Sequence, residues 1–335
     1  MPLISFNIVT FNRASFLKKC LSSIQNQYFK DIEIVIVDDG STDDTIQIID
    51  SFKDLPIKFF QNEKNAGISF SRNRAAKLSE GKYIAILDSD DECLPERLIW
   101  SLEVFEKNDA VDIVCGNAIF NGKIDEGIYR KVTDNLFVNL FFENPIIHST
   151  VLIRRSILIE NLYNIDYGVA EDFELWTRIV TPNNTVKINK PLAVYNCHTE
   201  NTSLTKSAEL QAAYFKIIFK NICDKLNIEI PGELLRFDTI SDPNKIIYSA
   251  SSLISKIENK LLNPNLVDLV TFQSNADMFV NSFKKFIYSN YFFKSKSYKR
   301  FPLFFQSFAN LLAIFGVFQT VKILGLIALN RISDH

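Results

Sequence analysis

Tyr83-Ile84-Ala85-Ile86-Leu87-Asp88-Ser89-Asp90-Asp91 is an apolar run that changes abruptly into three carboxylates within four residues. The apolar run is typical of a strand buried on both faces of a sheet. Three neighbouring acids repel one another and favour a nearby cation or several hydrogen-bond donors. Past the end of a strand, such oxygen ligands suit Mg²⁺ or Mn²⁺, so the stretch predicts a metal site. The alternative is an acidic turn in which Asp91 and Pro95 begin the next helix.

Strands and helices alternate on the N-terminal side of this stretch. Apolar residues at three- and four-residue spacing predict amphipathic helices, and β-branched runs between them predict strands. We expect strands at 3–9, 32–37, 57–60 and 83–87, and helices at 14–27, 42–51 and 68–79, the last closed by Gly81 as a C-cap. This alternation predicts βαβ units and a parallel sheet, hence a nucleotide-binding type of α/β fold over residues 1–115.

Polar residues follow three of these strands, at 10–13, 38–41 and 88–91. Because the carboxyl ends of parallel strands meet at one edge of a sheet, these side chains are expected to converge on one ligand. The chain has no GxGxxG after the first strand and no GxxxxGKS or GxxxxGKT, which disfavours a conventional dinucleotide site and a P-loop. A bound diphosphate would therefore be held by a metal.

After residue 115 the pattern is weaker. Strands are expected at 111–114, 117–120 and 146–153, and 121–144 is expected to form a loop or short helices over the site. A helix that begins at Ala170 has three acids in its first turn, where the helix dipole favours them whatever the function. A further strand is expected to start after Pro191 and to end at His198.

The composition fits a cytoplasmic globular protein. The 335 residues, 47% of them hydrophobic, predict one large domain with a smaller one, or two domains. A formal charge of −2 and the lack of a recognised motif argue against nucleic acid as a partner. Five cysteines without a CxxC pair predict neither a disulfide framework nor a zinc site. The N-terminus lacks the features of a signal peptide and is interpreted as the first strand.

Six motifs occur in order along the chain: Thr10-Phe11-Asn12-Arg13, Ile36-Val37-Asp38-Asp39-Gly40-Ser41-Thr42-Asp43, Asn65-Ala66-Gly67 with Ser71-Arg72-Asn73, Leu87-Asp88-Ser89-Asp90-Asp91, Glu171-Asp172-Phe173-Glu174-Leu175-Trp176, and His198. Together they resemble the motifs of family 2 glycosyltransferases, over roughly 3–203. The resemblance implies a GT-A type, Rossmann-like α/β sheet flanked by helices. It also implies inverting transfer of a sugar from a nucleoside diphosphate donor, usually UDP-linked, to a hydroxyl acceptor.

The resemblance implies a metal-assisted donor site. Asp88-Ser89-Asp90 resembles the DxD motif, in which Asp90 would bind Mn²⁺ or Mg²⁺ on the diphosphate. Asp88 would contact the ribose or sugar and contribute to the metal site. His198 is similar to a family histidine that closes over the diphosphate and the metal, although a structural role competes with this interpretation. Asp91 is expected to cap the following helix.

The resemblance also assigns the nucleotide contacts and the base. Asp39 would accept the uracil N–H, and Arg72 would lie near the base or the phosphates. The family's donor loop matches Thr10, Phe11, Asn12 and Arg13, with Phe11 packed on uracil. Asp172 resembles the catalytic base, which a single inverting displacement requires on the acceptor side, and Glu171 would orient the acceptor or the base. His148 resembles a segment under the acceptor pocket, and a core role is the alternative.

The C-terminal third is predicted to be mostly helical and lies outside the resemblance. Between Asp277 and Asp334 there is no acid, and eight Lys or Arg residues are interleaved with aromatic residues. This mixture favours the interface of an anionic membrane. The apolar stretch 311–329 is interrupted by polar residues, so an interfacial or protein-buried helix is favoured over a spanning one. The competing interpretation is a helical packing or dimerisation module that forms a homo-oligomer.

The sequence thus predicts a glycosyltransferase domain at 1–205 and a helical region at 206–335. The predicted enzyme uses a nucleotide-sugar donor and a saccharide or lipid-linked saccharide acceptor at the cytoplasmic face of the cell membrane. One alternative is a non-catalytic nucleotide-sugar-binding module, which the acids at both Asp90 and Asp172 argue against. The other is a sugar-1-phosphate nucleotidyltransferase, against which the missing early glycine-rich basic loop argues.

Overall fold

The computed structural model describes residues 1–120, 123–125, 144–181 and 183–198, with scattered positions between 136 and 256. The chain divides into two units, Met1–Val280 and Asn281–His335, and every described residue belongs to the first. No helix among the described residues is long and apolar enough to cross a membrane. Most of 121–143 and of the region after residue 198 lies outside the described residues. The domain boundary near residue 205 and the roles of the C-terminal third therefore stay predictions.

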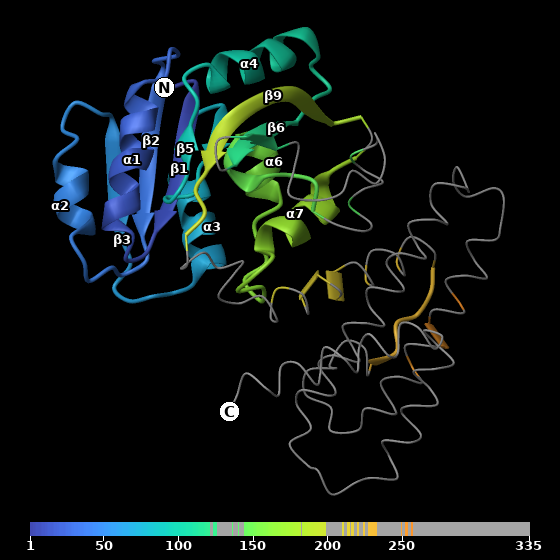
Figure 1. The fold of residues 1–335 in the computed structure, drawn as a ribbon. Coiled ribbons are helices and arrows are strands. Elements are labelled where there is room, and N and C mark those ends of the chain that lie inside the picture. The colour runs from blue at the N-terminus through green and yellow to red at the C-terminus, as the bar shows by residue number, and fades with distance from the viewer. Residues whose placement is uncertain are drawn as a thin grey trace, which may run out of the picture. The chain divides into compact units, whose positions relative to one another are not determined.

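Strands and helices alternate along the first half of the chain, as the periodicity predicts (Figure 1). The strands are β1 (Ile4–Thr10), β2 (Ile32–Asp38), β3 (Ile57–Gln61), β4 (Tyr83–Ile86), β5 (Glu92–Cys93), β6 (Ile113–Phe120), β7 (Lys123–Asp125), β8 (Leu152–Arg154) and β9 (Thr185–Tyr195). The helices are α1 (Ala14–Gln25), α2 (Thr45–Asp50), α3 (Ile68–Leu78), α4 (Arg97–Lys107), η1 (His148–Thr150), α6 (Arg155–Glu160) and α7 (Glu171–Ile179).

The sheet is mixed rather than purely parallel. Its strand order is β3-β2-β1-β4-β8-β6-β9-β5, with β7 paired to β6. The four strands from β3 to β4 are mutually parallel, as predicted. Strand β8 is antiparallel to both β4 and β6, and this places the segment before β8 beside the carboxyl end of β4. The antiparallel pairing thus joins the second half of the domain to the edge where β1, β2 and β4 end.

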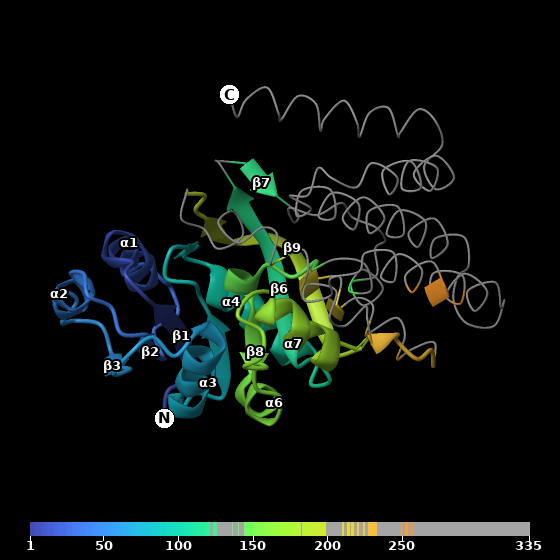
Figure 2. The ribbon, with the colours of Figure 1, turned by 90° about the horizontal axis from the view of Figure 1, so that it is seen from below.

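Helices cover both faces of the sheet, because the strand residues alternate between the two. Ile4, Phe6 and Ile8 of β1 belong to a core cluster that also contains residues of α1 and α4. Val35 and Val37 of β2 point to the opposite face and pack with Ala75 of α3. Figure 2 shows α1 and α2 on one side of the sheet and α3 with α6 on the other. The fold is therefore a mixed α/β sheet flanked by helices, as the sequence predicts.

Four of the expected strands are wrong in their bounds. One strand, β6, replaces the two expected at 111–114 and 117–120. The strand expected at 146–153 is a 3-10 turn followed by β8, because Thr150 N donates to Ile147 O over 3.0 Å and tightens the backbone. Strand β9 begins before Pro191 rather than after it. Pro191 lies beside an irregularity in the β6–β9 register, where the missing N–H of proline is tolerated.

Gly81 does not act as the expected helix C-cap. Helix α3 ends at Leu78, and Ser79 after it is already extended. Gly81 instead lies against β1, where its N–H donates to Ser5 Oγ over 2.8 Å. A Cβ at this position would come within 2.7 Å of Ser5 N and 2.8 Å of Ile4 C. The glycine is therefore required by close backbone packing before β4.

Arg97, the first residue of α4, is a fully buried cation beneath the end of β4. Its Nη2 donates to Ile86 O over 2.7 Å and to Val151 O over 3.0 Å. Burial lowers the pKa of Arg97 to about 10. The guanidinium thus holds together the two chain segments that lead into the acidic turn and into β8.

We expect Gly81→Ala to destabilise the domain, because the new methyl group would meet the backbone of β1. Overpacking of this kind lowers the free energy of unfolding by roughly 1–3 kcal/mol, which urea denaturation would measure. Gly168→Ala is the matched control, since a Cβ there meets nothing within 4 Å. Equal stability of the two variants would contradict the packing role of Gly81.

Candidate functional site

The acidic turn after β4 begins with Asp88, whose carboxylate is held by cationic and polar neighbours. Asp88 Oδ1 lies 2.9 Å from Arg72 Nη2 and 3.2 Å from His148 Nδ1. Its backbone N–H donates to Ser149 Oγ over 3.1 Å. Although burial opposes ionisation, Arg72 and His148 hold the pKa of Asp88 well below its ordinary value. Asp88 is therefore ionised, and one of its oxygens is already occupied.

Arg72 of α3 connects this turn to the start of α7. Its Nη2 lies 3.4 Å from Glu171 Oε1 as well as 2.9 Å from Asp88 Oδ1. Its Nη1 lies 2.8 Å from His148 Nδ1. The side chain is only 10% exposed, and although burial disfavours the cation, Asp88 and Glu171 raise the pKa of Arg72 above its ordinary value. A permanent buried cation thus joins the two acidic motifs.

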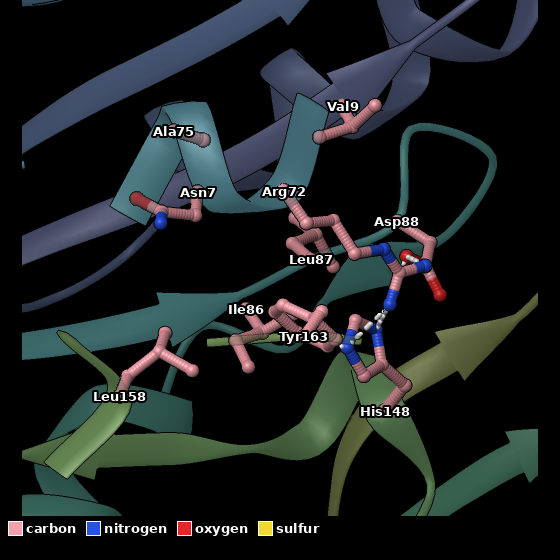
Figure 3. Close-up of a pocket in the computed structure, with 10 residues that line it drawn as sticks. All are labelled: Asn7, Val9, Arg72, Ala75, Ile86, Leu87, Asp88, His148, Leu158 and Tyr163. Atoms are coloured by element: carbon pink, nitrogen blue, oxygen red, sulfur yellow. Dashed lines mark hydrogen bonds and ion pairs between the residues drawn. The ribbon is translucent and has the colours of Figure 1, made fainter. Parts of the chain in front are cut away.

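Figure 3 shows Arg72 reaching over His148 toward Asp88, with Tyr163 on the other side of the imidazole. The Tyr163 hydroxyl lies 2.9 Å from His148 Nε2, and the centre of its ring is 5.6 Å from the Arg72 guanidinium carbon. These four side chains line a cavity of about 10 Å³, the size of about one water molecule. His148 is therefore placed in the polar floor beneath Asp88.

Three consecutive residues of α3 make separate contacts, because side chains one residue apart leave a helix in different directions. Ser71 Oγ donates to Asp39 Oδ1 over 2.9 Å, at the end of β2. Arg72 binds Asp88, at the end of β4. Asn73 exchanges two hydrogen bonds of 2.8 Å with the backbone of Tyr163. One turn of α3 thus positions all three parts of the site.

The rest of the acidic turn faces the segment after β9. Asp90 Oδ2 lies 3.0 Å from His198 Nε2, and the imidazole stacks on Phe16 of α1 with ring centres 4.2 Å apart. Burial and the neighbouring Asp88 raise the pKa of Asp90. Asn196 Nδ2 donates to Asp90 O over 2.9 Å. The structure thus brings together Asp90 and His198, although they are far apart in sequence.

We expected Asp91 to cap the following helix, but it does not. Helix α4 begins only at Arg97, and Glu96 is its N-cap residue. The buried Asp91 carboxylate instead accepts hydrogen bonds from Ser149 Oγ and, over 3.1 Å, from the Asn196 N–H. Burial and the other two acids raise its pKa well above the ordinary value. Asp91 therefore ties the turn to the segment after β9 and to η1.

The carboxylate and imidazole ligands at Asp90 and His198 fit a divalent cation. A cation beside Asp90 would offset the burial and charge repulsion that raise its pKa. Asp88 is directed differently, because one of its oxygens contacts Arg72 and His148. Among the described residues, no three His, Cys, Asp or Glu side chains form a ready-made group of ligands. The part of Asp88 in metal binding stays a prediction.

Asp172 and Glu171 begin α7, after Ala170 in the left-handed conformation. Glu171 is buried, and its pKa is raised by burial and by Asp172 against the opposing effect of Arg72. Asp172 is only partly buried, and Asn144 Nδ2 donates to its Oδ2 over 2.9 Å. The two neighbouring acids therefore have different environments. Sequence reasoning missed Asn144, which comes from a stretch without periodicity, and only its position before Pro145 indicated a turn.

The end of β1 and the loop after it, residues 10–13, are stabilised by hydrogen bonds to the loop after β2. Asn12, in the left-handed region at φ 52°, donates from its N–H to Ser41 Oγ and accepts from the Thr42 N–H, each over 2.8 Å. Thr10 is buried, and its carbonyl accepts from the Asp39 N–H over 2.8 Å. Phe11 is 42% exposed. The Arg13 guanidinium carbon lies 5.8 Å from the centre of the Phe16 ring. The contacts of residues 10–13 with the nucleotide-sugar donor stay predictions.

Asp39 anchors the loop before α3. Its Oδ1 accepts from the Ala66 N–H over 2.9 Å, from Asn62 over 2.7 Å and from Ser71. Its Oδ2 accepts from the Gly67 N–H over 3.0 Å. A carboxylate has about four acceptor positions, two on each oxygen. Asp39 already accepts four hydrogen bonds, so its predicted contact with uracil stays a prediction.

Comparison with known proteins agrees with this geometry. A model of "Glycosyl transferase family 2" matches residues 5–162. UDP-Glc:alpha-D-GlcNAc-diphosphoundecaprenol beta-1,3-glucosyltransferase WfaP of Escherichia coli is 29% identical over 211 residues, which cover 63% of this chain and 83% of that protein. Residues 5–162 contain the acidic turn, Arg72 and His148. The chain belongs to glycosyltransferase family 2.

Solved structures show the same fold. TarS 1–349 of S. aureus, in complex with UDP-GlcNAc, is 18% identical with a TM-score of 0.59, over 84% of this chain and 91% of that chain. The mannosyltransferase PcManGT of Pyrobaculum calidifontis, in complex with GDP-Man and Mn²⁺, is 16% identical with a TM-score of 0.51. The match covers 98% of this chain and 85% of that chain. This family 2 glycosyltransferase therefore has the predicted GT-A type fold.

We expect Arg72→Met to destabilise the glycosyltransferase domain, because Asp88 and Glu171 would face each other without a cation. Removal of one partner from a buried ion pair lowers the free energy of unfolding by about 3 kcal/mol or more, which chemical denaturation would measure. Lys77→Met on the same helix is exposed and should stay within about 0.5 kcal/mol of the unmodified chain. If both variants are equally stable, Arg72 does not connect the two acidic motifs energetically.

Proposed function

We propose that this chain transfers a sugar from a UDP-linked donor, with inversion, to a hydroxyl of a saccharide or lipid-linked saccharide. The observation that carries the proposal is the Arg72 bridge between Asp88 and Glu171. It places the start of α7, with Asp172, beside the turn that would bind the donor. A single displacement requires one carboxylate on the acceptor side that takes the hydroxyl proton, and Asp172 is the group proposed for this task.

Asp172 is the proposed general base. The acceptor oxygen attacks the anomeric carbon, and the bond between that carbon and the diphosphate oxygen breaks. The electron pair leaves with UDP, and the proton of the acceptor hydroxyl passes to Asp172. Asp172 is more exposed than Glu171, whose carboxylate is buried against Arg72, so Asp172 is the better placed of the two to meet an acceptor. Glu171 then orients the helix through Arg72.

Asp90 and His198 are the proposed holders of Mn²⁺ or Mg²⁺ next to the donor diphosphate, with Asp88 toward the ribose or sugar. When bound, such a cation stabilises the negative charge that collects on the departing diphosphate. PcManGT, which shares the fold, contains Mn²⁺ with its GDP-Man donor. In this chain, Phe16 supports the His198 ring and Asn196 holds the backbone of the acidic turn. Phe11 and Asp39 are the proposed contacts of uracil.

A lipid-linked acceptor is supported by the E. coli relative, whose name specifies a UDP-Glc donor and a diphosphoundecaprenol-linked acceptor. Such an acceptor lies at a membrane surface. The basic and aromatic residues after Asp277 are compatible with attachment to the cytoplasmic face of that membrane, although they lie outside the described residues. We therefore place the enzyme at the periphery of the membrane, where acceptor and donor meet.

Asp172→Asn should reduce sugar transfer to a low residual rate while UDP binding is kept, because the amide cannot accept the proton but has the same shape. Release of UDP from a panel of UDP-sugars with Mn²⁺ and acceptor would measure transfer. Calorimetric titration with UDP would measure binding. Asp166→Asn, in the exposed loop before α7, is the control and should keep full turnover. Full turnover of Asp172→Asn would rule out its role as the base.

Asp90→Ala should remove the Mn²⁺-dependent part of UDP binding, because the cation would lose an anionic ligand. Calorimetric titrations of UDP with Mn²⁺ and with EDTA would separate the two contributions. Asp54→Ala is an exposed control that should bind UDP like the unmodified chain. Equal Mn²⁺ dependence in Asp90→Ala and in the unmodified chain would place the metal elsewhere. UDP binding without turnover in any acceptor assay would instead favour a non-catalytic binding module.

A further inference from the structure

Asn144 is a buried residue that contacts the carboxylate of Asp172, and no motif of the sequence includes it. Its side chain is 4% exposed, and its Nδ2 lies 2.9 Å from Asp172 Oδ2. Its Oδ1 accepts from the Ile146 N–H over 3.2 Å. Both ends of the amide are therefore hydrogen-bonded. The oxygen is bound to the backbone two residues further along, and the NH₂ group is bound to α7.

The two hydrogen bonds agree on the orientation of the amide. The Ile146 N–H can only donate, so the oxygen of Asn144 faces it and the NH₂ group faces Asp172. The segment has its own anchors, because Ile146 is buried and Lys187 Nζ of β9 donates to Pro145 O over 3.1 Å. The amide is thus a fixed donor directed at one oxygen of Asp172.

Glu171 and Asp172 have partners of different charge. Arg72 approaches Glu171 Oε1 to 3.4 Å, whereas the hydrogen-bond donor to Asp172 among the described residues is a neutral amide. A cation stabilises a carboxylate anion and so weakens it as a base, while a neutral donor orients the group at less cost to its proton affinity. Burial nevertheless raises the pKa of Glu171 overall, so it is the greater exposure of Asp172 that favours it over Glu171 as the group that meets an acceptor hydroxyl.

We propose that Asn144 is a positioning residue for the base. Its amide binds Asp172 Oδ2, which fixes the plane of the carboxylate and leaves Oδ1 to receive the proton of the acceptor hydroxyl. This inference rests on the proposed function, since it requires that Asp172 is the base. Asn144 acts through Asp172 and touches neither the donor nor the reacting atoms.

The test compares Asn144→Ala and Asn144→Asp over a pH series from about pH 7 to 9, because two carboxyls this close share a proton until the pH is high enough to ionise both. We expect kcat to fall by roughly 10- to 100-fold in both, because a misplaced catalytic group costs up to about 10²-fold. KM for the UDP-sugar should change by less than about threefold, because the donor does not contact Asn144. Asn144→Asp has the shape of asparagine, so a packing role would leave it more active than Asn144→Ala. If Asn144 acts as a hydrogen-bond donor to Asp172, Asn144→Asp should be at least as impaired as Asn144→Ala.

A buried asparagine away from the site is the matched control. Asn117 of β6 is 3% exposed and donates from Nδ2 to Asn189 Oδ1 over 2.9 Å, a bond of the same length. Asn117→Ala should lose a similar amount of stability by thermal denaturation and keep its kcat. A loss of kcat in Asn117→Ala equal to that in Asn144→Ala would show that the effect is one of general stability, and it would overturn the inference.

A double-mutant cycle separates this inference from the proposed function. In the Asp172→Asn background, Asn144→Ala should reduce the residual turnover no further, because the group it positions is gone. A full additional loss in that background would contradict the positioning role. If Asp172→Asn keeps only a low residual rate while both Asn144 variants keep their kcat, the base assignment stands and the inference on Asn144 fails. Full activity of Asp172→Asn would overturn the proposed base and the inference with it.

Discussion

The buried Arg72 guanidinium, between Asp88 and Glu171, is the interaction on which the rest of the site depends. Two carboxylates in a largely buried space repel each other, and the cation turns that repulsion into attraction. Arg72 comes from α3, Asp88 follows β4, and Glu171 begins α7, so one side chain sets the relative position of three elements. His148 and Tyr163 fill the space beneath the guanidinium and limit its movement.

The sheet supports this contact from below. Arg97 holds the backbone at Ile86 and at Val151, the two segments that carry the acidic turn and η1. Gly81 lets the chain pass close to β1 just before β4 begins. Both features sit beneath the acidic turn rather than in it. The acids of the turn are therefore presented by a backbone that the core already holds in place.

The acids near the site differ in their partners, and the differences agree with separate tasks. Asp88 and Glu171 share a cation, Asp91 accepts from neutral donors of η1 and of the segment after β9, and Asp90 faces His198. Asp172 has a neutral amide as its donor and remains partly exposed. A structural carboxylate gains from strong compensation, whereas a proton acceptor or metal ligand must keep some of its reactivity.

Periodicity and motif order were enough to predict the α/β class, the parallel strands from β3 to β4 and the family, because these depend on local hydrophobic patterns and on residues close in sequence. The partners of Asp91, Gly81 and Asp172 could not be predicted in this way. They come from Ser149, Ser5 and Asn144: antiparallel β8 brings Ser149 close, β1 supplies Ser5, and Asn144 lies 28 residues before its partner. The sequence by itself thus determined which acids are present and at which strand ends. Only the tertiary structure decided their neighbours, because the environment of a carboxylate is set by side chains that are distant along the chain.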